Sequence, residues 1–176
     1  METLASDATG PLGEQAFDQK DFRHALGTFV TGVTIVTTLR VGGEPIGVTA
    51  NSFSSVSLSP PLVLWSLEKS SQNPRTFQSA EYFAINILAA DKMNLSQHFS
   101  RHRPDKFNGI AWQPGLGGVP MLDNVVMQLC CRNVIHHDGG DHIIFIGRVD
   151  YYMYAGRHPL VFARGLYMDL KERINA

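Results

Sequence analysis

Val33-Thr34-Ile35-Val36-Thr37-Thr38 is a run in which every side chain is branched at Cβ. Such side chains favour an extended backbone, so the run predicts a β-strand. A turn at 41–45 and the return strand Ile46–Ala50 follow it. Working outward, further strands are predicted at Pro61–Leu67, Tyr82–Leu88, Val125–His137, His142–Tyr152 and Leu160–Tyr167. Many short strands between turns favour a mainly β fold, an antiparallel barrel that is closed or partly closed.

Three helices are expected to cover this barrel. The first runs over Asp18–Phe29, with Asp18 as its N-cap and Gly32 ending the pattern. The second is Asn73–Ser79, with Pro74 at its first turn. The third is Asp91–Phe99, which is expected to turn Met93, Leu95 and Phe99 inward.

The composition fits one globular domain. Of the 176 residues, 44% are hydrophobic and 18% are charged, which is enough apolar matter for a full core. We expect this domain to span residues 18–170, between a flexible N-terminal tail at 1–17 and a C-terminal tail at 171–176. The 15 basic and 16 acidic side chains give a net charge of −1. Tight binding to nucleic acid needs a basic excess, so a nucleic-acid partner is not expected.

The two cysteines and the chain's apolar runs bear on location. Cys130 and Cys131 are neighbours, so they offer neither a disulfide framework nor a Cys-x-x-Cys metal site. The first residues have no basic and apolar signal segment, and no apolar run is long enough to cross a bilayer. We therefore expect a cytoplasmic protein with no membrane partner.

The stretch 47–61, Gly-Val-Thr-Ala-Asn-Ser-Phe-Ser-Ser-Val-Ser-Leu-Ser-Pro-Pro, is the strongest candidate for a binding site. Seven of these fifteen side chains carry a hydroxyl or an amide, directly before an apolar strand. Converging turn amides and small hydroxyls can hold a phosphate without a lysine. The alternative is a connection that caps its own backbone.

Three other segments could carry chemistry. Ser70-Ser71-Gln72-Asn73-Pro74 could cap a helix or offer free N–H groups to an anion. The run 136–142 holds three histidines and two aspartates, but His136 and His137 alternate across a strand, so no metal site is predicted. His142 could instead contact a ligand, and Arg164-Gly165-Leu166-Tyr167 could flank a close approach or make only a surface ion pair. Dinucleotide-binding glycine motifs, P-loops and serine-hydrolase elbows are absent from the sequence.

Five stretches in matching order resemble the short-chain flavin reductase family, which includes the reductase components of two-component flavin monooxygenases. The resemblance covers about 22–167, and its stretches are Phe22–Thr34, Thr49–Ser57, Pro60–Val63, Gly140–Gly147, and Pro159–Leu160 with Arg164–Tyr167. It implies the FMN-binding split barrel, antiparallel and of Greek-key type. It also implies NAD(P)H-dependent reduction of free FMN or FAD by hydride transfer from nicotinamide to flavin N5. A homodimer is implied, as is a separate monooxygenase that receives the reduced flavin by diffusion.

The same resemblance assigns site residues. The implied flavin-binding residues are Thr49, Ala50, Asn51, Ser52, Ser54, Ser55, Val56, Ser57, Ser71, Asn73, Phe99 and Ser100. His142 is the implied catalytic residue, positioned on the nicotinamide side with Arg164 and Tyr167. The chain departs from the family at Ser59 and at Arg148, where acidic or amide residues are common.

Two functional alternatives remain open. The protein could retain its flavin and reduce a ferric chelate or a corrinoid, or it could bind flavin without turnover. The sequence does not decide between FMN and FAD. It shows no evident basic cluster to hold a 2′-phosphate, which favours NADH over NADPH.

Overall fold

The computed structural model describes residues 18–170, so the two predicted tails at 1–17 and 171–176 lie outside it. The β-branched run forms strand β2, which is buried along almost its whole length. The helices are α1 Gln19–Leu26, α2 Pro74–Ser79 and α3 Met93–Ser100, with short 3₁₀ turns at Ala90–Lys92 and Leu116–Gly118. The strands are β1 Thr31–Gly32, β2 Thr34–Leu39, β3 Pro45–Ala50, β4 Ser54–Leu58, β5 Pro61–Glu68, β6 Tyr82–Ile87, β7 Trp112–Pro114, β8 Pro120–Leu122, β9 Met127–Gly139, β10 His142–Tyr154, β11 Val161–Ala163 and β12 Leu166–Met168.

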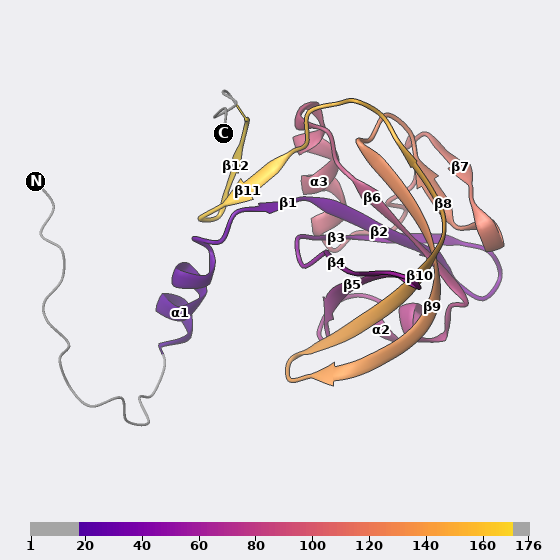
Figure 1. Cartoon of the computed structure of the whole chain (residues 1–176), viewed down its shortest axis with the longest axis horizontal. Coiled ribbons are helices and arrows are strands. Elements are labelled where there is room, and N and C mark those ends of the chain that lie inside the picture. The colour runs from indigo at the N-terminus through magenta and orange to yellow at the C-terminus, as the bar shows by residue number, and fades with distance from the viewer. Residues whose placement is uncertain (1–17, 171–176) are drawn as a thin grey trace, which may run out of the picture.

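Seven strands form one curved antiparallel sheet in the order β3-β2-β6-β9-β10-β5-β4 (Figure 1). The two edge strands, β3 and β4, are consecutive in the chain and are joined by residues 51–53 alone. The sheet therefore curls until its edges approach without pairing. This arrangement confirms the predicted split barrel, mainly β and antiparallel, and β4 is a strand that the sequence analysis did not predict.

Aromatic side chains fill the barrel. Trp65 stacks on Phe145 with ring centroids 4.7 Å apart, and Phe77 from α2 meets Trp65 edge-on at 5.2 Å. These three rings and Phe83 are each at most 1% exposed. Gly147 allows this packing, because a Cβ built there would lie 2.5 Å from the Phe83 ring. Helix α2 thus contributes to the main core.

Helix α3 covers the outside of β2 and β3. Phe99 is fully buried, and its ring lies so close to Gly47 that a Cβ there would come within 2.7 Å of it. Met93 at the start of the helix is 41% exposed, so the prediction that it turns inward is wrong. The apolar contacts of α3 come from Leu95 and Phe99, as predicted.

Helix α1 and the small sheet β1-β11-β12, here called the arm, stand to one side of the barrel (Figure 1). Asp18 caps α1 as predicted, but the helix ends at Leu26 rather than Phe29. The Arg164 amide donates to the Gly27 carbonyl at 2.6 Å and ties α1 to the β11–β12 turn.

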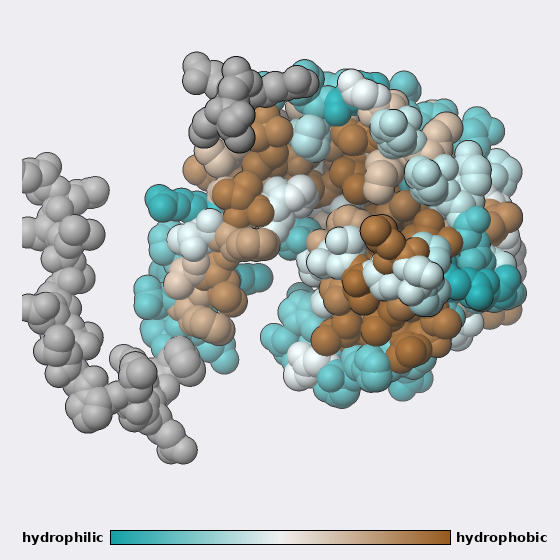
Figure 2. Space-filling model, viewed as in Figure 1, coloured by the Kyte–Doolittle hydropathy of each residue, from teal (hydrophilic) through white to brown (hydrophobic). Residues whose placement is uncertain are grey.

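Apolar side chains on the arm are exposed. Leu26, Phe29 and Val30 expose 59%, 78% and 58% of their surface. Figure 2 shows apolar surface on α1 and again on the barrel across the hollow that separates the two. Among the described residues, the helices include none that is long and apolar enough to span a membrane.

Candidate functional site

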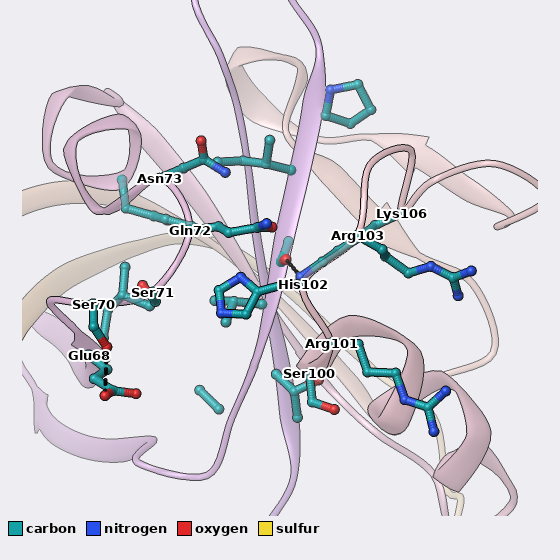
Figure 3. Close-up of a pocket in the computed structure, with 18 of the residues that line it drawn as sticks. Glu68, Ser70, Ser71, Gln72, Asn73, Ser100, Arg101, His102, Arg103 and Lys106 are labelled. Atoms are coloured by element: carbon teal, nitrogen blue, oxygen red, sulfur yellow. Dashed lines mark hydrogen bonds between the residues drawn. The ribbon is translucent and has the colours of Figure 1, made fainter.

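A cleft of about 1000 Å³ opens beside the point where the barrel splits. Its floor is β3 with the 51–52 connection, one wall is the loop 68–73 between β5 and α2, and the other is the loop 100–108 that follows α3. Figure 3 shows the two loops facing each other across strands of the sheet. Segments far apart in the sequence thus converge on one open space.

Many of the residues singled out from the sequence line this cleft: Thr49, Ala50, Asn51, Ser52, Ser71, Asn73, Ser100 and His142. The other singled-out residues lie elsewhere. Ser54, Ser55, Val56 and Ser57 belong to the edge strand β4, and Phe99 packs behind the floor against Gly47. The segment 54–57 is therefore a strand in the described structure and not part of a loop around the cleft.

The hydroxyls of Ser52 and Thr49 on the floor form hydrogen bonds within the protein. Ser52 Oγ accepts from the Ser66 amide at 2.8 Å and donates to the Ser66 carbonyl at 3.0 Å. Thr49 Oγ1 donates to the Ser96 carbonyl at 2.7 Å. In contrast, the main-chain amides of Asn51 and Phe53 make no hydrogen bond within the described residues. The floor therefore offers a ligand backbone donors more than hydroxyls.

Ser71 differs from Ser52 and Thr49. Its Oγ is buried and has no hydrogen-bond partner among the described residues, and the residue lines the cleft. A buried hydroxyl without a partner costs free energy that a ligand can recover. Its neighbour Asn73 is engaged, because its Oδ1 accepts from Arg40 Nη2 at 3.0 Å.

His142 lies at the end of the cleft nearest β5, where its backbone pairs with Glu68. Its Nδ1 is 2.6 Å from Asp141 Oδ1. The hydrogen bond with His142 lowers the pKa of the Asp141 carboxyl. The carboxylate thus orients the ring. Within residues 18–170, no group of His, Cys, Asp and Glu side chains is arranged to hold a metal ion.

The second wall carries basic residues that the sequence analysis did not single out: Arg101, His102, Arg103 and Lys106. Lys106 Nζ donates to the carbonyls of Phe99 at 2.8 Å and Gly47 at 3.2 Å, and burial lowers its pKa. With Arg23 and Arg40, the lining has five Lys or Arg side chains against Glu44, Glu68 and Asp105, so it favours anions. In the sequence, the dense basic run at 101–106, directly after the predicted helix Asp91–Phe99, could have indicated this anion-binding wall.

Arg164 and Tyr167 lie outside this cleft. Arg164 lines a second cleft of about 890 Å³ between α1 and the β11–β12 turn, which meets the first at Arg23 and Asn51. The Tyr167 hydroxyl is 2.9 Å from Ser96 Oγ. Tyr167 therefore reaches the floor through Ser96, the residue whose carbonyl binds Thr49.

The donor set fits a flavin nucleotide. A flavin ring needs donors along its polar edge and a phosphate needs an anion-attracting wall. The cleft supplies the free backbone amide of Asn51, the Ser71 hydroxyl without a partner among the described residues, and the basic second wall. Backbone donors and a cationic wall 100–108 thus lie on different sides of one space large enough for a nucleotide.

Comparisons with known proteins give consistent results. The sequence model of one protein family, the flavin reductase like domain, matches residues 26–171. The chain is 43% identical to "FMN reductase (NADH) SmoA" of Agrobacterium fabrum, covering 89% of this chain and 87% of that protein. It is also 43% identical to the reductase component of the flavin-dependent trigonelline monooxygenase of Acinetobacter baylyi, over 84% of this chain. The chain spans about half the length of two of the curated relatives that it matches, 49% and 48%.

A solved structure shows that the fold is similar as well as the sequence. The NADH:FAD oxidoreductase SgcE6 of Streptomyces globisporus, in complex with NAD and FAD fragments, superposes with a TM-score of 0.85 at 35% identity. The match covers 90% of this chain and 96% of that one.

Two serines of the cleft should respond oppositely to truncation. Ser52→Ala removes two hydrogen bonds between the 51–53 connection and β5, so we expect the free energy of unfolding to fall by about 1–2 kcal/mol. Ser71→Ala removes a buried hydroxyl without a partner, so the free energy should stay within about 0.5 kcal/mol or rise. Urea denaturation of the ligand-free protein measures both. Equal losses in the two variants would show that Ser71 is bonded in the free protein.

Proposed function

Because this chain belongs to the family of flavin reductase-like domains, we propose that it is an NADH-dependent reductase of free FMN or FAD. Its product would serve a separate flavin-dependent monooxygenase, as the name of the trigonelline relative describes for that protein. The single observation that carries the proposal is the cleft itself, where free backbone amides and the unpartnered Ser71 hydroxyl face a cationic wall. We include a cytoplasmic location in the proposal, since NADH is held there.

The flavin supplies the redox chemistry, because its N5 accepts a hydride from C4 of the nicotinamide. The residues of this chain have only to bind and orient. In the proposal the backbone at the 51–53 connection donates to the polar edge of the flavin ring, and Ser71 and Asn73 hold the ribityl phosphate or the longer FAD tail. Ser100 lines the same space. Phe99 supports the floor from behind through Gly47.

His142 is proposed to position the nicotinamide. Its ring is oriented by Asp141 at 2.6 Å and lines the same cleft as the flavin loop, so one polar contact can hold the second ring face to face with the first. Arg164 would approach from the second cleft, which meets the first at Asn51. Tyr167 would act through Ser96 on the floor.

A second copy of the chain is proposed to cover the arm. Leu26, Phe29 and Val30 form an exposed apolar strip, and burying such side chains is favourable by about 1.5–3 kcal/mol each. The hollow between arm and barrel has apolar surface on both sides (Figure 2), as a homodimer exchanging arms requires.

Gel filtration with light scattering should give twice 19.5 kDa, and a mass of 19.5 kDa would contradict the homodimer.

The activity itself is tested without oxygen. NADH and catalytic amounts of the chain should bleach an excess of FMN or FAD at about 450 nm, and the flavin should separate from the protein on gel filtration. Flavin that stays bound and passes electrons to a ferric chelate or a corrinoid would favour the first alternative. Flavin that binds but is never bleached by NADH or NADPH would favour a non-catalytic flavin-binding protein.

His142→Ala should lower kcat/KM for NADH by the equivalent of about 1–3 kcal/mol, because one polar contact to the nicotinamide nucleotide is lost. Flavin affinity, measured by quenching of flavin fluorescence, should stay near that of the parent protein. Unchanged kcat and KM for NADH would remove His142 from the site. Weakened flavin binding with normal NADH use would move it to the flavin side.

A further inference from the structure

Two exposed side chains face each other across the cleft from its opposite walls. Figure 3 shows the ring of His102 pointing from the second wall toward the loop 70–72, and the side chain of Gln72 extending toward the same space. Arg101 and Arg103, the neighbours of His102, point the other way. Neither His102 nor Gln72 makes a side-chain hydrogen bond or ion pair within the described residues. Both are therefore available to a ligand in the cleft.

The loop that carries His102 is closed on itself at its base. Lys106 Nζ reaches back to the Phe99 carbonyl at 2.8 Å, and the Lys106 carbonyl lies 2.7 Å from His98 Nε2. Arg103 Nη1 lies 3.1 Å from the other nitrogen of the same His98 ring. His102 thus projects from a braced turn, which reduces the entropy lost when it contacts a ligand.

The facing loop is held in the same way. The Ser71 amide donates to the Glu68 carbonyl at 3.0 Å, and Ser70 Oγ donates to Glu68 Oε1 at 2.7 Å. At the other end, Arg40 fixes the side chain of Asn73. Within the described residues, the side chains of Gln72 and Ser71 are the two of this loop that make no hydrogen bond at the cleft.

The chemistry of the facing groups suits a phosphate. Imidazole and amide N–H groups and a hydroxyl each donate to phosphate oxygens, and the five basic side chains of the lining provide a favourable field. An apolar ring would gain nothing from these donors. The space between Gln72 and His102, next to Ser71, is therefore suited to the phosphate-bearing tail of a nucleotide.

We propose that His102 and Gln72 form a clasp that closes on the phosphate of the bound flavin and determines how quickly the flavin leaves. The clasp rests on the proposed function, because it assigns a role in the flavin site of that reductase. It adds specificity-determining residues outside the set that the sequence pointed to. It also assigns the discrimination between phosphorylated flavin and riboflavin to side chains from two separate loops.

The test compares dissociation of FMN with dissociation of riboflavin from the full chain. Stopped-flow dilution, followed by recovery of flavin fluorescence, gives the dissociation rate constant for the parent protein and for His102→Ala and Gln72→Ala. Each variant should release FMN roughly three to ten times faster, the factor expected for one lost hydrogen bond, and should release riboflavin at the parent rate. His137→Ala, an exposed histidine on β9 away from the cleft, is the matched control and should leave both rates unchanged.

His102→Gln separates contact from structure. It keeps an N–H donor, so it should restore most of the slow FMN release, and KM for NADH should stay the same in all of these variants. Equal rates in parent and variants, or equal acceleration of FMN and riboflavin, would overturn the clasp while leaving the reductase proposal intact. A parent chain that binds neither flavin would instead contradict the proposed function, and the clasp with it.

Discussion

The short connection between the two edge strands is the constraint on which the site depends. Strands β3 and β4 are the two edges of a seven-stranded sheet, yet they are joined by residues 51–53 alone. The Ser52 hydroxyl fixes this connection to β5 by bonding both the amide and the carbonyl of Ser66. The edges are thereby brought together without pairing, and the main-chain donors of the connection stay available beside the gap.

Both walls of the cleft are tied to this joint. The loop 68–73 leaves directly from the end of β5, the strand that Ser52 holds. The loop after α3 is tied to β3 by Lys106, whose ammonium donates to the Gly47 carbonyl, and by Phe99, which packs against the same glycine. The two wall loops therefore keep a fixed relation because each is bonded to the floor that lies between them. This is why one open cleft, and not separate surface loops, collects the polar segments.

Much of the barrel could be predicted because its strands carry local signals. The β-branched run of β2 and the Asp138–Asp141 turn specify their own conformation. Strand β4 could not be predicted in this way, because its serines have weak strand propensity and it owes its conformation to pairing with β5. Met93 was placed inward by helical spacing, but the register of α3 on the barrel turns the buried stripe toward Phe99. The basic wall is visible as a run at 101–106, but only packing shows that it faces the loop 68–73.

The balance between engaged and free groups explains how such a site can both bind and release a nucleotide. Thr49, Ser52 and Lys106 form their side-chain hydrogen bonds within the protein, which makes the cleft rigid but leaves these side chains little to offer a ligand. Among the described residues of the cleft, backbone amides at the connection and the side chains of Ser71, Gln72 and His102 are free to donate. Because each free donor adds only about 0.5–1.5 kcal/mol, a site built this way holds a ligand with moderate affinity. A reductase whose reduced flavin must leave after every turnover requires that balance, since tighter side-chain capture would slow its release.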